Sequence, residues 1–135
     1  MSKIGFDMDG VLLPDYNKIV GLGDREFFLQ TLYAKPIFNP IGEFDIVTAR
    51  LEIWRDITEE WLQQLTTYPK NVFMRADEDT ETPAEFKYKI AIQQKYTHFI
   101  ESDPIVCREM SQLNQKHTTY LSIIHFDKFI SESFY

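Results

Sequence analysis

The chain has 135 residues, a formal net charge of −7 and an isoelectric point of about 4.9. This length predicts one domain, residues 1–135, and the acidic surplus argues against a protein that grips the phosphate backbone of nucleic acid, because such binding needs excess Lys and Arg. The sequence has a single cysteine, no apolar run near the roughly 20 residues that span a bilayer, and an early polar residue, Asp7. These features predict a cytoplasmic protein without disulfides, signal peptide or membrane segment.

The first half of the chain alternates short apolar runs with stretches of helical pattern. Residues 3–6 are a predicted strand, and Asp24 is expected to cap a short helix. A second strand is expected at residues 44–47. The apolar residues beyond it recur at helical spacing and predict an amphipathic helix whose two tryptophans belong to the core. These residues are Trp54, Ile57, Trp61, Leu62 and Leu65.

The second half continues the same alternation. A short apolar strand is expected at residues 72–75. The run Thr82-Pro83-Ala84-Glu85 has the cap, first-turn proline and glutamate of a capping box, so a helix should begin there. Another strand is expected at residues 97–100, followed by a helix that opens at Asp103-Pro104. Residues 119–124 supply the last predicted strand.

Strands separated by helices predict a doubly wound α/β fold with a mostly parallel sheet of about five strands, because parallel neighbours need crossover connections. In such folds ligands bind beyond the carboxyl ends of the strands. Polar residues follow three of the predicted strands, so one edge of the sheet is expected to hold the functional site. They are Asp7 and Asp9, Thr48 and Arg50, and Glu101 and Asp103.

Asp7 and Asp9 form the most informative pair. Side chains alternate along an extended chain, so both carboxylates can lean the same way at the end of the first strand, and Gly10 permits the turn that keeps them there. Two like charges this close disfavour each other unless a cation lies between them, and magnesium, Mg2+, is the natural candidate. The alternative for the pair alone is an acidic turn after a strand.

Four segments together resemble the motifs of the haloacid dehalogenase (HAD) superfamily. Residues 6–12, Phe-Asp-Met-Asp-Gly-Val-Leu, look like its first motif, and residues 46–50, Ile-Val-Thr-Ala-Arg, resemble its second. Lys87, early in a predicted helix, suits the third motif, and the acidic run at residues 99–103 suits the fourth. The resemblance implies a Rossmann-like HAD core and a phosphatase that uses Mg2+.

The resemblance also implies roles for individual residues. Asp7 would be the nucleophile that forms an aspartyl-phosphate, and Asp9 the acid and base for the leaving oxygen and the hydrolytic water. Both would contribute to the metal site, Asp9 through its backbone carbonyl. Thr48 would hydrogen-bond a phosphoryl oxygen, while Lys87 would offset the charge shared by the phosphate and Asp7. The residues expected to bind substrate are Thr48, Ala49, Arg50 and Lys87.

The fourth motif departs from the family pattern. Many relatives place two adjacent aspartates after this strand, but this chain has Glu101-Ser102-Asp103. Glu101 directly follows the predicted strand and is the preferred metal ligand, through direct contact or a coordinated water. Asp103 is a second candidate ligand, and the alternative for it is the cap of the next helix.

A finer resemblance concerns the substrate. Residues 73–75, Phe-Met-Arg, followed by the acidic run at 77–80 and then Lys87, look like the corresponding segment in the phosphatase half of phage-type polynucleotide kinase-phosphatases. This resemblance suggests phosphates of nucleotides or nucleic-acid ends as substrates. The acidic composition argues against a long nucleic-acid contact. The alternative for Arg75 is an exposed residue at the end of a strand.

The spacing of the first two motifs leaves no room for a full cap domain. About 35 residues separate them, and half of these form the turn and one helix, so the site is expected to stay open to large substrates. The loop at residues 14–23, with Tyr16, is the expected partial lid. The sequence makes no prediction of the oligomeric state.

Two rival functions come from other classes. A receiver domain of a signalling pair also has an acidic pair, a Thr and a Lys, but it needs an aspartate at the end of the third strand, where this chain has Arg75. The second rival is a catalytically quiet relative that binds a partner, with the aromatic tail at residues 125–135 as a docking strip. The presence of both Asp7 and Asp9 argues against this loss of activity.

Overall fold

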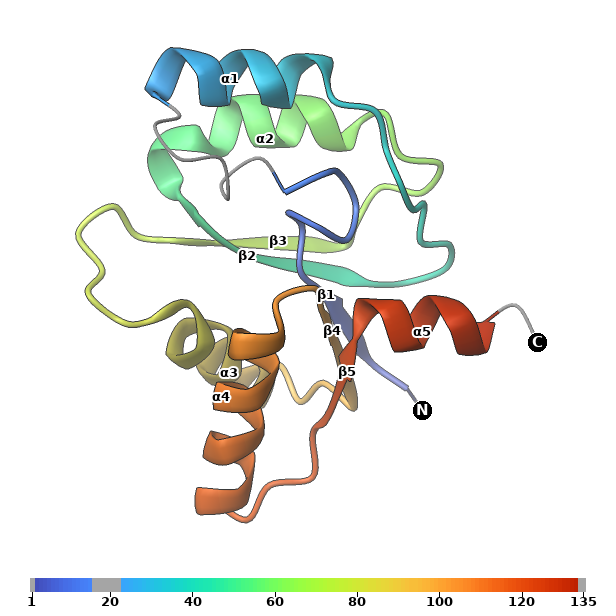
Figure 1. Cartoon of the computed structure of the whole chain (residues 1–135), viewed down its shortest axis with the longest axis vertical. Coiled ribbons are helices and arrows are strands. Elements are labelled where there is room, and N and C mark those ends of the chain that lie inside the picture. Colours follow the sequence, from blue (N-terminus) through green and yellow to red (C-terminus); the bar gives the residue numbers. More distant parts are fainter. Residues whose placement is uncertain (1, 16–22, 134–135) are drawn as a thin grey trace.

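The computed structural model describes residues 2–15 and 23–133 (Figure 1). Tyr16 and most of the expected partial lid lie outside the described residues. None of the helices in the described part has the length and apolar character needed to cross a membrane. The elements are, in chain order, β1 (Ile4–Phe6), α1 (Asp24–Tyr33), β2 (Asp45–Leu51), η2 (Glu52–Trp54), α2 (Arg55–Leu62), β3 (Asn71–Arg75), α3 (Pro83–Gln93), β4 (His98–Glu101), α4 (Pro104–Lys116), β5 (Ser122–His125) and α5 (Phe126–Ser133).

The five strands form one parallel sheet in the order β3-β2-β1-β4-β5. In the central strand β1, Phe6 pairs with Ile46 of β2 on one side and with Ile100 of β4 on the other. The chain adds β2 and β3 on one side of β1 and then crosses over to add β4 and β5, so the topological switch point lies between β1 and β4. This confirms the predicted doubly wound α/β fold, with a sheet that is parallel throughout.

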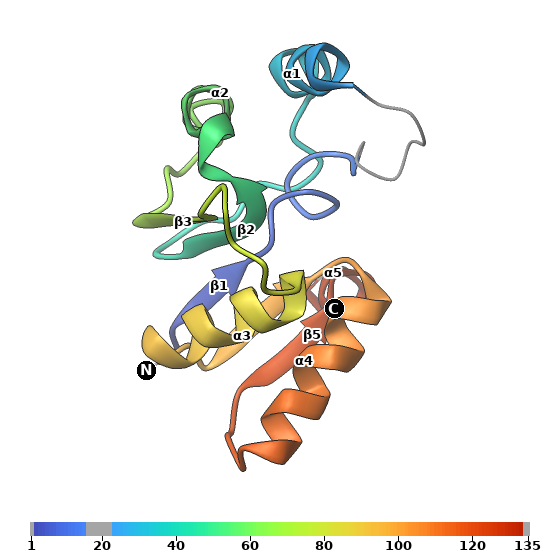
Figure 2. The same ribbon diagram turned by 90° about the vertical axis from the view of Figure 1, so that its left-hand side faces the viewer.

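Successive strand residues enter two different cores, because neighbours along a strand point to opposite faces of the sheet. Ile46 packs into one core with Trp61 of α2. Val47 packs into a second core with Phe86 of α3 and Met110 of α4. Figures 1 and 2 show the same arrangement, with α1 and α2 on one side of the sheet and α3 and α4 on the other. Coverage of both faces explains why the strands are apolar along their length.

Local capping signals set the starts of α3 and α4. Thr82 Oγ1 accepts a hydrogen bond from the backbone N–H of Glu85 (3.1 Å), and Glu85 Oε1 accepts one from the backbone N–H of Thr82 (3.0 Å). This reciprocal pair is the predicted capping box. At the start of α4, Asp103 Oδ1 accepts a hydrogen bond from the N–H of Ile105 (2.8 Å). Both predicted helix starts are confirmed.

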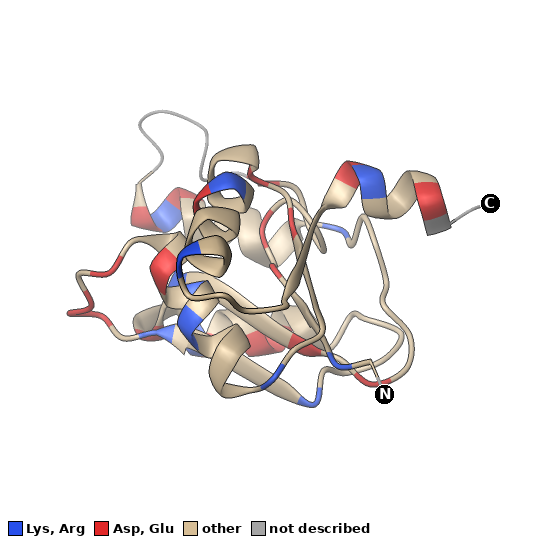
Figure 3. Cartoon of the chain, turned by 90° about the horizontal axis from the view of Figure 1, so that it is seen from below, with Lys and Arg blue, Asp and Glu red and all other residues tan. Residues whose placement is uncertain are grey.

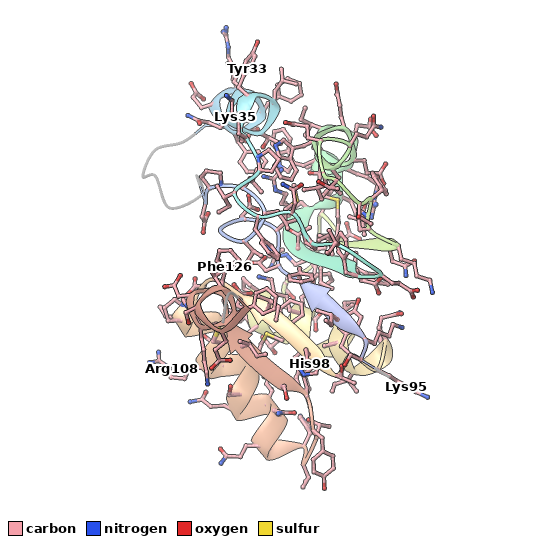
Figure 4. All side chains as sticks on the ribbon, turned by 90° about the vertical axis from the view of Figure 1, so that its right-hand side faces the viewer. Tyr33, Lys35, Lys95, His98, Arg108 and Phe126 are labelled. Carbon is pink, nitrogen blue, oxygen red and sulfur yellow. The ribbon has the colours of Figure 1, made fainter. Side chains whose placement is uncertain are left out.

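The start of α1 differs from the prediction. Gly23, and not Asp24, is the N-cap, and no side chain caps the helix. Asp24 lies in the first turn, where a carboxylate is favourable because the free N–H groups of the helix carry partial positive charge. Within α1 only Thr31 is buried, while Tyr33 points away from the body of the protein with 76% of its surface exposed (Figure 4). The helix rests on α2.

The strand β2 is longer than predicted. It was expected to end at Val47, but its pairing with β3 continues through Thr48 and, after an irregularity in register, reaches Leu51. Thr48 and Arg50 therefore lie in the irregular end of the strand and not after it. Such irregularities redirect side chains at the edge of a sheet, often next to a functional site.

The C-terminal segment forms a helix, α5, that the sequence analysis did not predict. The rings of Phe126 and Phe129 each lie 5.7 Å from the ring of Phe38, measured between centroids, and Phe129 also lies 5.8 Å from Phe6. Figure 4 shows Phe126 at the start of α5. Phe126 and Phe129 are partly buried against the core, so their rings are only partly available to a partner. Phe134 and Tyr135 of the expected docking strip lie outside the described residues, and the docking strip stays a prediction.

Candidate active site

A pocket of about 670 Å³ opens at the carboxyl ends of β1, β2 and β4, beside the switch point of the sheet. The carboxyl ends of parallel strands meet at one edge, which brings together side chains that are far apart in the sequence. All eight residues that the sequence predicted for the site line this pocket. They are Asp7, Asp9, Thr48, Ala49, Arg50, Lys87, Glu101 and Asp103.

A tight turn after β1 holds the first two carboxylates. The N–H of Asp7 donates to the carbonyl oxygen of Ile100 (2.9 Å) and so extends the ladder between β1 and β4. Gly10 then adopts a φ of 86°, a left-handed conformation that suits glycine. A side chain at Gly10 would also collide with the hydroxyl of Ser102. The next residues, 11–13, are fully buried and anchor the turn in the core.

Asp7, Lys87 and Glu101 form a buried charged cluster at the base of the pocket. The Lys87 ammonium donates to Asp7 Oδ1 (3.0 Å) and to Glu101 Oε1 (2.6 Å). Burial, together with the charge of Glu101, raises the pKa of Asp7 well above its usual range, although Lys87 opposes this rise. Burial opposes the charge on Lys87, but the two carboxylates outweigh it and hold the pKa of Lys87 above its usual range. A charged lysine therefore lies against a carboxylate that is costly to ionise.

Both oxygens of the Glu101 carboxylate accept hydrogen bonds from groups of the protein. Besides the bond from Lys87, its Oε2 accepts hydrogen bonds from the backbone N–H groups of Ser102 and Asp103, both at 2.9 Å. The residue is completely buried. In this arrangement Glu101 fixes the position of Lys87. That Glu101 or Asp103 holds a metal stays a prediction; Asp103 uses one carboxylate oxygen to cap α4.

Asp9 is bound by Arg50. Arg50 Nε donates to Asp9 Oδ2 (2.9 Å) and Arg50 Nη2 donates to Asp9 Oδ1 (2.7 Å), which makes a bidentate pair. Arg50 is itself fixed by the hydroxyl of Thr58 at 3.2 Å and by Phe27, whose ring centroid lies 4.6 Å from the guanidinium carbon. In the structure the guanidinium of Arg50 holds the second aspartate of the first motif. That Arg50 binds substrate stays a prediction.

Thr48 lies in the irregular end of β2, and 1% of its surface is exposed. Its hydroxyl oxygen accepts a hydrogen bond from the backbone N–H of Arg50 (3.1 Å). Because a hydroxyl can accept and donate at the same time, Thr48 keeps a donor for an acceptor in the pocket. Its neighbour Ala49 lines the pocket without adding charge.

The oxygen atoms around Ser102 are the part of the site that could hold a divalent cation. Ser102 Oγ lies 3.4 Å from Asp7 Oδ2 and 3.0 Å from the backbone oxygen of Asp9. These are hard oxygen donors, and Mg2+ commonly takes one or two carboxylates and completes its shell with water and substrate oxygens. Within the described residues, no group of three or more His, Cys, Asp or Glu could hold a metal. The donors present fit a Mg2+ ion that keeps several waters.

Sequence reasoning missed Ser102 as a site residue. The sequence signal was its position directly after Glu101, where the HAD motif that this segment resembles has a second acidic residue. The hydroxyl reaches both the Asp7 carboxylate and the Asp9 carbonyl because Gly10 leaves room for it.

Phe27 of α1 and Trp54 of η2 form an aromatic wall of the pocket, which sequence reasoning also missed. Their ring centroids are 4.9 Å apart and their planes are inclined by 59°. Both side chains are half-buried, and neither belongs to one of the two cores. The helical spacing of Trp54 and Trp61 predicted that both lie in the core; this is correct for Trp61 and wrong for Trp54.

No family model, curated protein or solved structure matches this chain. The chemistry of the site therefore has to follow from its own groups. A buried carboxylate beside a lysine, a hydroxyl donor and hard oxygen atoms surround one pocket. Groups of this kind bind a phosphoryl group and offset its charge during transfer.

Proposed function

We propose that the protein is a magnesium-dependent phosphomonoesterase that acts through an aspartyl-phosphate at Asp7. The observation that carries this proposal is the 3.0 Å contact of Lys87 with Asp7 at the base of a pocket at the switch point. A carboxylate beside a fixed cation can accept a phosphoryl group, because the cation offsets the charge of the approaching phosphate. The resemblance of residues 6–12 and 46–50 to HAD motifs supports the same chemistry.

In the first step a carboxylate oxygen of Asp7 attacks phosphorus, and the bond between phosphorus and the leaving oxygen breaks. Asp9 gives its proton to that oxygen, which leaves as an alcohol. Lys87 and the hydroxyl of Thr48 offset the negative charge on the phosphoryl oxygens. A bound magnesium ion, held by the Asp7 carboxylate and the Asp9 carbonyl, would supply further positive charge for those oxygens.

In the second step water attacks the phosphorus of the aspartyl-phosphate. Asp9 accepts a proton from this water, and the bond between phosphorus and the Asp7 oxygen breaks. The products are inorganic phosphate and the restored Asp7 carboxylate. Burial of Asp7 against Lys87 limits its motion, so the same oxygen is in place for the next cycle.

The mechanism requires a movement of Arg50. Its donors occupy both carboxylate oxygens of Asp9, so one of these bonds opens before Asp9 transfers a proton. A phosphate is also a bidentate acceptor for a guanidinium. Substrate binding therefore offers Arg50 a second partner and frees an oxygen of Asp9.

The experiment that tests this function is hydrolysis of 4-nitrophenyl phosphate in the presence of Mg2+. Asp7→Asn removes the nucleophile and is expected to lower the rate to background. Asp127→Asn is the matched control, because its side chain is 90% exposed on α5. Undiminished turnover by Asp7→Asn would contradict the aspartyl-phosphate, and turnover that persists with excess EDTA would contradict the role of magnesium.

A catalytically quiet phosphate-binding domain is the second candidate. The internal pairing of Asp9 with Arg50 and of Glu101 with Lys87 favours it, since both carboxylates are occupied. Saturable phosphate binding without hydrolysis of any ester would support this candidate. A receiver domain is disfavoured, because β1 lies between β2 and β4 here, whereas in receiver domains it lies between β2 and β3.

Nucleotide phosphates are the proposed substrates, from the resemblance of residues 73–80 to phage-type enzymes. The loop between β3 and α3 carries acidic residues, which Figure 3 shows projecting at the edge of the chain. Negative charge there opposes the approach of a long phosphate backbone. A mononucleotide fits this surface better than a nucleic-acid end.

A further inference from the structure

The pocket has much more room than a phosphoryl group needs. The residues proposed to act on the phosphate, Asp7, Thr48 and Lys87, are all buried. A volume of about 670 Å³ is in the range of pockets that enclose a whole small molecule. The remaining space is available to the alcohol part of the ester, which becomes the leaving group.

The aromatic wall bounds this space. Phe27 comes from α1 and Trp54 from η2, so two separate elements place large rings at the same pocket. The rings stay half-buried outside both cores, and their contact therefore does not serve to fill the interior. Two rings that meet at the edge of a pocket, with centroids 4.9 Å apart, form a surface against which another flat ring can pack.

Arg50 links the aromatic wall to the reacting groups. Its guanidinium carbon lies 4.6 Å from the Phe27 centroid, while its nitrogens hold Asp9 at 2.7 and 2.9 Å. Asp9 is the residue proposed to protonate the leaving oxygen. The aromatic wall is thus separated from that residue by one side chain, on the side of the pocket where the alcohol part of the ester would lie.

The charges around the pocket limit what the leaving group can carry. Among the described residues, the cations that line it are Arg50 and Lys87, and both are paired with carboxylates. A second phosphate would be repelled by the acidic lining, because like charges interact strongly in a partly desolvated pocket. The carboxylates that line it are Asp7, Asp9, Asp15, Asp24, Glu101 and Asp103.

We propose that the aromatic wall binds the leaving group of the substrate, and that this leaving group is a flat, uncharged ring system without a second phosphate. Nucleosides and aryl-substituted alcohols share this chemistry. The inference rests on the proposed phosphomonoesterase function and narrows it: a mononucleotide or a simple aryl ester is a substrate, whereas a nucleotide with a further phosphate is a poor one.

The test compares kcat/KM for matched monoesters. Adenosine monophosphate and ribose phosphate differ only in the base, and an adenosine bisphosphate adds a second phosphate. Benzyl phosphate represents the aryl esters and distinguishes them from nucleosides. Because stacking of a base on an aromatic side chain has a known strength, adenosine monophosphate should exceed ribose phosphate by about 5- to 100-fold, and benzyl phosphate should also exceed it. The bisphosphate should react more slowly than the monophosphate.

Variants of the wall test its role directly. Trp54→Leu and Phe27→Leu are expected to lower the ratio of kcat/KM for adenosine monophosphate to that for ribose phosphate toward unity. Phe28→Leu is the matched control, because Phe28 is the next residue of α1, is 41% exposed and does not line the pocket. The control should retain the wild-type ratio.

The outcomes distinguish a failure of the proposed role of the wall from a failure of the phosphatase proposal. Unchanged kcat/KM ratios in both wall variants would contradict the proposal that the wall binds the leaving group. A wild-type protein that prefers ribose phosphate or the bisphosphate would contradict it as well. If no ester is hydrolysed, the phosphatase proposal fails. Binding of the nucleotide then tests the role of the aromatic wall separately. Adenosine monophosphate should then still quench the fluorescence contributed by Trp54, measured as the difference between wild type and Trp54→Leu. The absence of that quenching would contradict the proposal that the aromatic wall binds the ring of the leaving group.

Discussion

The two sides of the pocket are built in opposite ways. The buried charged cluster consists of Asp7 directly after β1, Lys87 of α3 and Glu101 at the end of β4, and each side chain is at most 6% exposed. The aromatic wall, Phe27 and Trp54, is half-buried, and the helix α1 that carries Phe27 has one buried residue and no side-chain cap. The groups proposed to act on the phosphate are therefore fixed by the core, while Phe27, which is proposed to contact the leaving group, belongs to a helix with few buried residues.

Lys87→Met should show the largest effect, because it leaves two buried carboxylates without their cation. We expect a loss of about 3–5 kcal/mol in the free energy of unfolding and a fall of about 10²–10³-fold in kcat. Urea denaturation and ester hydrolysis measure the two effects. Lys89→Met is the control on the same helix: its side chain is 46% exposed, so it should cost less than about 1 kcal/mol. Equal losses in both variants would contradict the importance of burial.

Arg50→Lys tests the junction between the two sides. Lysine cannot reproduce the bidentate bonds to Asp9 or the contact with Phe27, so the free energy of unfolding should fall by about 1.5–3 kcal/mol. Arg55→Lys removes a comparable guanidinium from the surface pairs with Glu52 and Glu59, and should cost under about 1 kcal/mol. If the two substitutions cost the same, the buried pair adds nothing beyond a surface ion pair.

The raised pKa of Asp7 predicts an unusual dependence of stability on pH. Since the folded-state pKa lies above the unfolded value of about 3.9, Asp7 stabilises the fold fully below that pH and loses this contribution as the pH rises toward the folded-state pKa. Relative to Asp7→Asn, the free energy of unfolding of the metal-free wild type should therefore fall between pH 4 and neutrality. Thermal melts across this range, with Asp127→Asn as control, measure the difference. Parallel profiles for wild type and Asp7→Asn would refute it.

The smallest effect should come from strengthening the start of α1. Gly23 has extended backbone dihedrals at the N-cap, and Glu26 stands three residues later, as Glu85 does after Thr82 in α3. Gly23→Ser would complete a capping box and is expected to add a few tenths of a kcal/mol. Slower hydrogen exchange in α1, about two-fold, with no change in α3, would show this. Exchange slowed equally in both helices would mean a global effect.

Much of the fold was predictable because its signals are local. The capping box at Thr82, the cap at Asp103 and the alternation of apolar strands with helices each depend on residues close in sequence. Their order then predicts a parallel sheet, and the sheet brings all eight predicted site residues to one pocket. The end of β2 was missed, since its irregular pairing depends on the neighbouring strand β3.

The partners within the site were less predictable, because they depend on geometry between distant elements. Arg50 pairs with Asp9, which lies 41 positions away in the sequence. No local sequence pattern shows that Arg50 pairs with this carboxylate in the folded protein. Trp54 and Trp61 have the spacing of residues on one face of a helix. Trp54 nevertheless belongs to the short helix η2, which places its side chain at the pocket. The contact of Phe126 and Phe129 of α5 with Phe38 likewise depends on the folded arrangement and not on a local sequence pattern.

The position of the switch point divides the site between two contiguous halves of the chain. The part up to β3 supplies Asp7, Asp9 and Thr48, and the part after the exposed loop at residues 76–82 supplies Lys87 and Glu101. The halves share an interface, because β1 pairs with β4 and the rings of α5 pack against the first half. A cut in that loop would thus yield two fragments, each lacking a complete site, whose reassembly could be followed by the return of the site itself.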